Sequence, residues 1–315
     1  MKIVVAGANG LIGKALVRAL SARGDQVTAL VRKPQALAGA TAVQWDGREG
    51  SWASVIDGAD AVVNLAGAGV ADHRWTDDYK RQILESRTHS TKALVEAIGK
   101  AQVKPRVLVN ASAVGFYGGR GDELVDETAT PGTDYLAGVT RAWEEEALRA
   151  PVRAVLLRTG IVLSREGGAL AKMLPPFKAF VGGPIGNGRQ WMPWIHLDDE
   201  VAAIVFAIDH QELQGPVNLT APKPVTMGEF AKALGKVLHR PSWAPVPAAA
   251  LKIVLGEFAN VLVEGQRAVP AALQRAGFTF RFSELAAALE DLFGHRASSP
   301  AAASKAPPSS STSTS

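Results

Sequence analysis

Three glycines recur at every third residue near the N-terminus, at positions 7, 10 and 13. They directly follow an apolar run, Lys2–Ala6, and they open an amphipathic run, Leu11–Arg23. In a strand–turn–helix unit the first glycine allows a tight turn, the second lets the backbone approach a pyrophosphate, and the third lets the helix pack on the strand. The N–H groups at the start of the helix would then face the phosphates. We predict a dinucleotide site formed by Gly7, Asn9, Gly10, Leu11, Ile12 and Gly13, with an ordinary glycine-rich βα turn as the alternative.

The end of the second predicted strand, Gln26–Val31, indicates which dinucleotide is bound. An NAD site usually has an acidic residue about twenty positions after the glycines, where it accepts a hydrogen bond from the ribose 2′-OH. This sequence has no carboxylate there and instead has Arg32 and Lys33. An arginine fork and a lysine charge suit a 2′-phosphate. We therefore predict NADP rather than NAD, unless both cations simply face water.

Two further strand ends fall in the same predicted cleft. Asp46 follows the strand Thr41–Trp45, where it could contact adenine or serve only as a turn residue. The strand Ala61–Leu65 ends at Leu65 and is followed by Ala66 and Gly67, whose small size permits close approach to a ribose. We count all four among the residues that bind the cofactor.

The chain alternates strand-like and helix-like segments over its first two-thirds. Continuous β-branched runs separated by amphipathic helices are typical of parallel strands covered on both faces. We predict an α/β fold with a Rossmann-type, doubly wound parallel sheet and a smaller, mostly helical C-terminal lobe. Ligands of such sheets bind at the carboxyl ends of the strands. The remaining predicted strands are Arg106–Ala111, Ala154–Thr159 and Pro216–Leu219, and the main helices are Asp77–Ala101, Tyr135–Arg149, Leu197–Ile208, Thr226–Leu238, Ala248–Phe258 and Glu284–Phe293.

These segments predict three regions. Residues 1–220 form the dinucleotide-binding domain, with an insertion at about 160–195 that borders the substrate. Residues 221–296 form a small helical domain. Residues 297–315 consist of Ala, Ser, Pro and Thr with one lysine, so they have little to bury and are predicted to be disordered.

The composition excludes several classes of protein. The 315 residues include no cysteine, so disulfides and thiolate chemistry are ruled out. The net charge of +4 arises from Lys and Arg scattered among acids, which does not indicate nucleic-acid binding. The six histidines lack ligand spacing, so no metal site is predicted. No apolar run reaches membrane-spanning length and no signal-peptide core is present, so we expect a cytoplasmic protein without a membrane partner.

Seven segments together resemble the extended short-chain dehydrogenase/reductase superfamily, in particular its atypical branch of epimerase-family, sugar-nucleotide-epimerase-like proteins. The likeness spans about residues 1–293, and the later helices resemble the small C-terminal domain of that branch. It implies an enzyme that uses NAD(P) on a small molecule, and by analogy a homodimer formed through the two helices Asp77–Ala101 and Tyr135–Arg149. The segments are Gly7–Gly13, Asn64–Gly67, Arg74–Thr76, Glu85–Arg87, Ser112–Gly118, Leu157–Leu163 and Gly188–Asp199.

The sequence departs from this superfamily at its catalytic pair. Relatives use Tyr-x-x-x-Lys, in which the lysine lowers the pKa of the tyrosine so that it can transfer protons. Here Val139 stands four residues after Tyr135, and alignment on the following glutamate puts Thr140 at the lysine position. Arg87 takes the place of the usual upstream asparagine and could supply the positive charge instead. We predict a catalytic group of Ser112, Tyr135, Tyr117 and Arg87, with buried packing of the tyrosines as the alternative.

The substrate is expected beyond the nicotinamide, along the irregular segment 182–191. Arg189 could clamp an anionic group and Trp191 could stack on a ring, although a surface loop is an equally good interpretation. The favoured function is an NADP-binding oxidoreductase or epimerase-like enzyme that acts on a small polar substrate such as a sugar nucleotide. The alternative, motivated by the broken Tyr–Lys pair, is a non-catalytic NADP-binding redox sensor or regulator.

Overall fold

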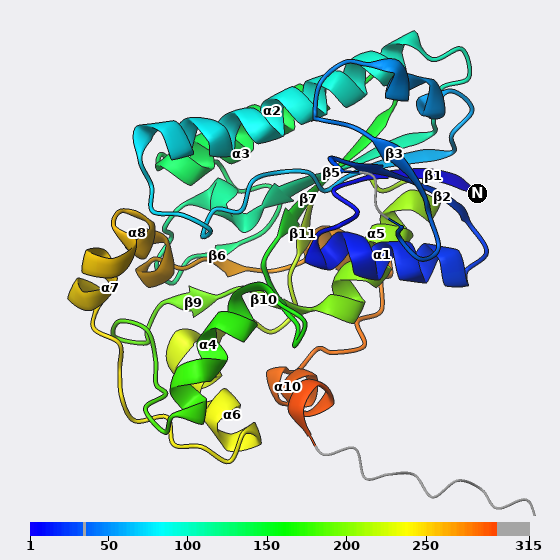
Figure 1. Cartoon of the computed structure of the whole chain (residues 1–315). Helices are drawn as coiled ribbons and strands as arrows, with labels where there is room; N and C mark the ends of the chain where they lie inside the picture. Colours follow the sequence, from blue (N-terminus) through cyan, green and yellow to red (C-terminus); the bar gives the residue numbers. More distant parts are fainter. Residues whose placement is uncertain (34–35, 295–315) are drawn as a thin grey trace, which may run out of the picture.

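The computed structural model describes residues 1–33 and 36–294, and it has the predicted α/β architecture (Figure 1). A seven-stranded, entirely parallel sheet has the strand order β11-β7-β5-β4-β1-β2-β3. The predicted disordered tail, 297–315, lies outside the described residues. The strands are β1 (Lys2–Ala6), β2 (Gln26–Val31), β3 (Thr41–Gln44), β4 (Ala61–Asn64), β5 (Val107–Ala113), β7 (Arg153–Thr159) and β11 (Gly215–Leu219).

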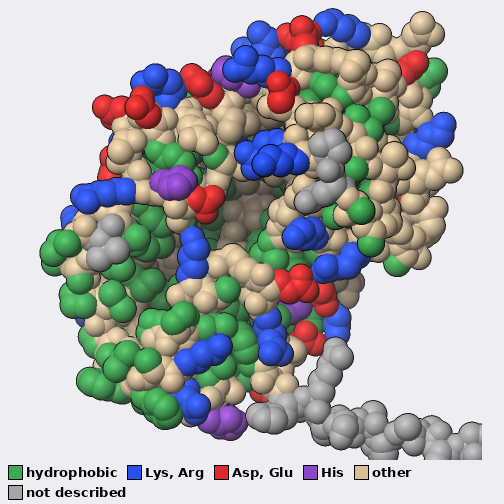
Figure 2. All heavy atoms as spheres, in the orientation of Figure 1, with side chains coloured by type: hydrophobic (Ala, Val, Ile, Leu, Met, Phe, Trp, Pro, Cys, Tyr) green, Lys and Arg blue, Asp and Glu red, His purple; other side chains and the backbone are tan. Residues whose placement is uncertain are grey.

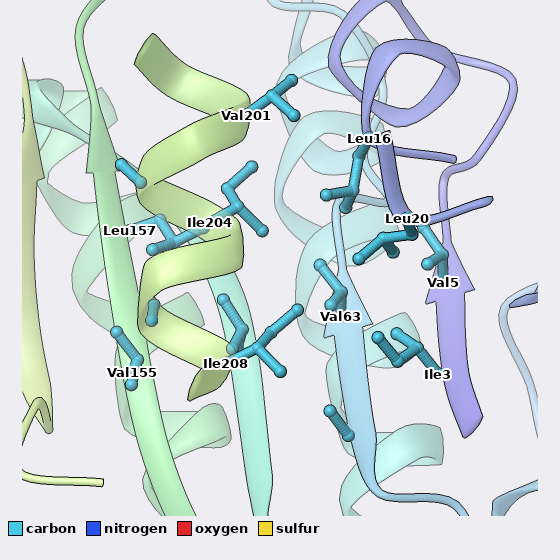
Figure 3. Close-up of a cluster of buried hydrophobic side chains, with 14 of the residues drawn as sticks. Ile3, Val5, Leu16, Leu20, Val63, Val155, Leu157, Val201, Ile204 and Ile208 are labelled. Carbon is cyan, nitrogen blue, oxygen red and sulfur yellow. The ribbon is translucent and has the colours of Figure 1, made fainter. Parts of the chain in front are cut away.

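Helices cover both faces of this sheet, as its apolar strands require. On one face lie α1 (Leu11–Ala22) and α5 (Leu197–Asp209), and on the other lie α2 (Asp77–Lys100) and α3 (Tyr135–Ala147). Figure 3 shows the face of the sheet that α1 and α5 cover. Leu16 and Leu20 of α1 and Ile204 and Ile208 of α5 point onto the strands there. The sheet order reverses between β4 and β1, so the start of α1 lies beside the end of β4.

A smaller lobe extends from the carboxyl edge of the sheet and has a core of its own. Trp194, Phe230, Leu234 and Leu289 are buried there. Its helices are α4 (Gly168–Lys178), α6 (Met227–Val237), α7 (Ala248–Leu255), α8 (Phe258–Val263) and α10 (Leu285–Phe293). Helix α9 (Ala271–Arg275) lies against β11 instead and buries Leu273 in the core of the sheet. Three two-stranded pairings link the lobe to the loops: β8 (Ile161–Leu163) with β10 (Trp194–His196), β9 (Trp191–Met192) with β12 (Val225–Thr226), and β6 (Leu124–Val125) with β13 (Arg267–Ala268).

The structure differs from the sequence prediction mainly in this lobe. The predicted helix Ala248–Phe258 is two helices, because Gly256 adopts a left-handed conformation (φ 63°) that ends α7. Helix α4 was not predicted, since Pro175 and Pro176 lie inside it. Both prolines lack an N–H donor, yet their carbonyl groups still accept hydrogen bonds from Ala179 and Val181. No helix among the described residues is long and apolar enough to cross a membrane.

Candidate functional site

The glycine turn between β1 and α1 leaves no room for side chains. Gly7 has φ 76°, and a Cβ atom there would lie 2.6 Å from the carbonyl carbon of Leu65. A Cβ at Gly13 would overlap the carbonyl oxygen of Gly7. Gly10 donates its N–H to that same oxygen at 3.0 Å, which closes the turn. The packing of α1 and of the β4 end around the turn therefore requires glycine at positions 7 and 13.

The start of α1 offers unused hydrogen-bonding groups. Gly10 is the N-cap residue, so no side chain caps the first-turn N–H groups, and that turn has no acidic residue. The Oδ1 atom of Asn9 is buried and has no hydrogen-bond partner among the described residues. Free N–H donors at a positive helix end fit a diphosphate, and an unpaired amide oxygen fits a hydroxyl group. These groups suit the predicted dinucleotide.

A buried polar network shapes the loop after β4. Asn64 donates to Asn110 Oδ1 at 2.7 Å and to Thr91 Oγ1 at 2.9 Å, while its own Oδ1 accepts from the N–H of Ala66 at 3.1 Å. The loop of Leu65, Ala66 and Gly67 is thereby fixed against the glycine turn. A Cβ at Gly67 would lie 3.2 Å from the guanidinium carbon of Arg87, so Arg87 borders the same loop.

The ends of β2 and β3 lie side by side at the same edge, with Val31 opposite Gln44. Arg32 and Lys33 are exposed immediately after β2. Asp46 is exposed after β3, and its Oδ1 accepts from the N–H of Arg48 at 3.0 Å. Asp46 thus makes a side-chain turn of its own, as one of the two sequence interpretations expected.

Ser112, at the end of β5, is tied into a buried charge network. Its hydroxyl donates to Glu144 Oε1 at 2.6 Å. Arg158 of β7 donates to both oxygens of the same carboxylate, each at 2.9 Å. Because an ionised carboxylate can only accept, the Ser112 proton is committed to Glu144, and Ser112 offers only lone pairs to any other group.

Tyr117 points into this network rather than into an open cleft. The residue is fully buried, and its hydroxyl donates to Asn218 Oδ1 at 2.6 Å and accepts from Arg158 at 3.1 Å. Burial raises the pKa of Tyr117 to about 12, although the charge of Arg158 opposes this shift. The structure therefore leaves the Tyr117 hydroxyl no free direction in which to meet a substrate.

Tyr135 and Arg87 lie near each other at the start of α3 and the middle of α2. The Tyr135 hydroxyl donates to the carbonyl group of Lys80, and Arg87 donates to the carbonyl group of Ile83 at 2.9 Å. Burial raises the pKa of Tyr135, while the positive charge of Arg87 acts in the opposite direction. Thr140 donates to backbone carbonyls within α3, so it supplies no charge to the phenol.

Two cavities open beside these residues. The smaller, of about 130 Å³, is lined by Tyr135 together with Trp75 and residues of α8. The larger, of about 750 Å³, is lined by Arg189 and by several glycines. The face drawn in Figure 2 is hollowed near its middle, with Lys and Arg side chains at the rim of the hollow. The larger cavity is lined by Tyr117–Asp122, Thr130–Asp134, Asn187, Arg189, Gln190 and Val263–Gly265.

Trp191 lies at the border of the larger cavity but is held in place. Its Nε1 donates to Asp122 Oδ1 at 2.8 Å, and the guanidinium of Arg267 lies 4.5 Å from its ring centroid. Arg189 is exposed and donates only its backbone N–H, to Asn187. His196 caps α5 by accepting from the N–H of Asp198 at 3.1 Å.

The structure thus brings the predicted residues into separate groups. The glycine turn, Asn9 and the loop Leu65–Gly67 meet at one edge, and Arg87 borders that loop at Gly67. Tyr135 borders the smaller cavity, and Ser112 and Tyr117 share a buried network. Sequence reasoning missed the partner of Ser112. Glu144 stands four residues after the expected lysine position and could have signalled it, whereas Arg158 lies on a distant strand.

Comparison with known proteins gives consistent matches over nearly the whole chain. The NAD dependent epimerase/dehydratase family model matches residues 3–219, and a domain of unknown function, DUF1731, matches residues 246–292. An epimerase family protein of Mycobacterium leprae, ML0860, is 44% identical over 91% of this chain and 94% of its own length. The chloroplastic SDR39U1 homologue of Arabidopsis thaliana is 43% identical over 92% of this chain and 86% of its own length.

A solved structure agrees with these matches. The crystal structure of human epimerase family protein SDR39U1 (isoform 2) with NADPH superimposes with a TM-score of 0.87. It is 35% identical to this chain, and the match covers 94% of this chain and all of the human chain. The match therefore includes the small helical lobe as well as the parallel sheet.

Proposed function

This chain belongs to the NAD-dependent epimerase/dehydratase family, and we propose that it is an NADP(H)-binding enzyme that oxidises, reduces or epimerises a small polar substrate. The observation that carries the proposal is the uncapped start of α1, packed through Gly7 against the end of β4. The human relative with 35% identity was crystallised with NADPH, which supports the same cofactor here.

The cofactor would lie along the carboxyl edge of the sheet. The free N–H groups of Leu11–Gly13 would hold the diphosphate, and Asn9 Oδ1 would accept from a hydroxyl group. Arg32 and Lys33 would bind the 2′-phosphate of the adenosine, with Asp46 beside them. The loop Leu65–Gly67 would contact the ribose on the nicotinamide side. No carboxylate at the end of β2 competes with the 2′-phosphate.

Tyr135 is the proton donor in this proposal. When bound, the nicotinamide supplies a hydride donor or acceptor. The Tyr135 phenol, whose pKa burial raises, carries its proton at neutral pH. It would donate that proton to a substrate oxygen in place of the Lys80 carbonyl group that accepts it in this structure. Arg87 places a positive charge near that phenol from another position than the usual lysine, which is Thr140 here. Ser112 would hold the end of β5 in place through its hydrogen bond to Glu144 of α3. Tyr117 would contribute to the buried network instead of to proton transfer.

The larger cavity suits a small polar substrate. Its lining includes three carboxylates, Asp122, Asp134 and Glu264, against the guanidinium groups of Arg120 and Arg189. Arg120 is already committed to the carbonyl groups of Tyr117 and Thr130. Only Arg189 is therefore available for an anion, which favours a neutral or singly charged substrate over the diphosphate of a sugar nucleotide.

A redox sensor remains the second proposal, and it is favoured by one observation. Thr140, at the position of the usual lysine, makes only backbone hydrogen bonds within its own helix. A protein that binds NADP but lacks the proton-transfer pair could report on cofactor oxidation without turnover. In that case the nucleotide would bind tightly and its C4 hydrogen would not exchange.

Hydride exchange separates the two proposals. The protein would be incubated with NADPH deuterated at C4 and with the small-molecule fraction of a cell extract, and the label on the nicotinamide would be followed by mass spectrometry. An enzyme moves the label in a protein-dependent manner, and Tyr135→Phe slows this loss. Full retention of label by protein that demonstrably binds NADPH would leave the sensor as the function.

A further inference from the structure

The small lobe exposes a cluster of large apolar side chains at the end of α4. Phe180 is 55% exposed, Val181 49% and Trp243 69%. They come from two segments far apart in the sequence, which pair through hydrogen bonds from Ala244 N–H to the Gly182 carbonyl (3.1 Å) and from Val246 N–H to the Pro184 carbonyl (2.9 Å). We name Phe180, Val181 and Trp243 the aromatic tip. Contiguous exposed apolar groups of this kind mark interaction surfaces.

The aromatic tip is held in place by specific contacts. Phe180 adopts a left-handed backbone (φ 62°), which side chains other than glycine rarely do. The indole N–H of Trp243 donates to the Phe180 carbonyl at 3.1 Å, and the guanidinium of Arg240 lies 4.4 Å from the Phe180 ring centroid. Because the only polar atom of Trp243 is bonded within the protein, its ring is free to enter apolar surroundings. The strained residue persists because these contacts hold it, which is typical of functional positions.

The surroundings of the tip are cationic. The segments 167–197 and 230–256, from which the tip comes, contain no Asp or Glu, and they place Lys178, Lys236 and Arg240 within a few residues of the tip. Within the described ranges, none of Lys178, Lys236 and Arg240 lies within 4 Å of a carboxylate on any other element. Figure 2 shows hydrophobic side chains covering the lower left of this face, with Lys, Arg and His side chains along its lower edge.

Taken together, the geometry points to peripheral docking of this tip on an anionic lipid bilayer. Trp and Phe side chains favour the boundary between headgroups and acyl chains, and unpaired lysines and arginines are attracted to acidic headgroups. A second copy of the chain would bring cations against cations, so self-association through this face is disfavoured. The exposed rings of Phe180 and Trp243 offer an apolar surface that nucleic acid would not use.

This proposal goes beyond the proposed function and departs from the sequence-based expectation of no membrane partner. That expectation rested on the absence of a spanning segment, whereas docking needs only a surface that the fold assembles from two distant segments. The substrate cavity and the glycine turn are formed by other residues, so cofactor binding does not depend on the tip.

Vesicle flotation with the full chain tests the proposal. The protein should float with vesicles of phosphatidylcholine and phosphatidylserine, less so at high salt, and not with phosphatidylcholine alone. Trp243→Ala and the double variant Lys236→Glu, Arg240→Glu should each reduce the bound fraction at least tenfold. Leu148→Ala, which removes an exposed apolar side chain on the large lobe, is the matched control and should leave binding unchanged.

NADPH binding and melting temperature check that every variant is folded. The proposal is overturned if the wild-type protein ignores acidic vesicles at low salt, or if Trp243→Ala floats as well as the wild type. Binding to DNA or to an acidic polypeptide that survives Trp243→Ala would also overturn it, because the surface would then be merely cationic.

Discussion

Arg158 and Glu144 form a buried, bidentate ion pair at the carboxyl edge of the sheet. Two guanidinium nitrogens, Nε and Nη2, donate to the two carboxylate oxygens at 2.9 Å each, and both side chains are less than 10% exposed. Glu144 also accepts a hydrogen bond from the hydroxyl of Ser112, and Arg158 donates one to the hydroxyl oxygen of Tyr117. The ion pair joins α3 to β7.

Removing one partner of this pair should be strongly destabilising. Arg158→Met leaves the Glu144 carboxylate buried without its counter-charge, which should cost about 3–5 kcal/mol of unfolding free energy. Urea denaturation measures the loss. The control is Arg149→Ala, which removes an exposed pair with Glu146 and should cost less than about 1 kcal/mol. Equal losses in the two variants would mean that the buried pair adds no more than a surface contact.

Gly13→Ala should damage both the fold and cofactor binding. The new methyl group would overlap the Gly7 carbonyl oxygen and push α1 away from the glycine turn. We expect a loss of about 1–3 kcal/mol in stability and at least a tenfold weaker affinity for NADPH. Gly99→Ala is the matched control, because that helical glycine faces open space and alanine there should stabilise by up to about 1 kcal/mol. Unchanged NADPH affinity in Gly13→Ala would refute the tight-turn argument.

Substitutions of Tyr135 and Tyr117 should have different effects, the first on hydride exchange and the second on stability. Tyr135→Phe removes the proposed proton donor beside the smaller cavity, so it should slow hydride exchange at least tenfold with little loss of stability. Tyr117→Phe removes the hydroxyl that is hydrogen-bonded to the buried side chains of Asn218 and Arg158. It should lower the free energy of unfolding by about 1–3 kcal/mol instead of slowing hydride exchange. Hydride exchange and urea denaturation are measured on both. The reverse pattern would assign the proton donor to Tyr117.

Glu200 should make stability fall as pH rises. This carboxyl is fully buried, and burial raises its pKa from 4.5 to about 8. Within residues 1–33 and 36–294 its one hydrogen bond is accepted from the Thr159 hydroxyl at 2.9 Å. Between these pH values the unfolded chain has lost the proton that the folded protein keeps, so the penalty grows by about 1.4 kcal/mol per pH unit and levels off above pH 8. Glu200→Gln removes that penalty.

Urea denaturation at several pH values checks this sign. The stability advantage of Glu200→Gln over the wild type should be larger at pH 7.5 than at pH 5.5. Parallel stability curves for the two proteins would show that Glu200 titrates normally in the folded state.

Local signals predicted the sheet well but not the contacts between distant segments. The strands β1 and β2 were predicted to the residue, because apolar runs and glycines define them within a few positions. The partner of Ser112 lies 32 residues away on α3, and no local pattern pairs the two. The break at Gly256 depends on a left-handed conformation that the sequence alone does not require, and the aromatic tip exists only because Gly182 and Ala244 pair.

The most direct test of the proposed cofactor is a parallel titration with NADPH and NADH, followed by thermal stabilisation and nicotinamide fluorescence. NADPH at about one hundred times its Kd should stabilise the protein by about 2.7 kcal/mol. We expect NADPH to bind much more tightly than NADH, and Arg32→Ala to abolish that preference, while Arg81→Ala, an exposed cation on α2, changes nothing. Equal binding of both nucleotides, or of neither by folded protein, would contradict the assignment of this edge of the sheet as an NADP site.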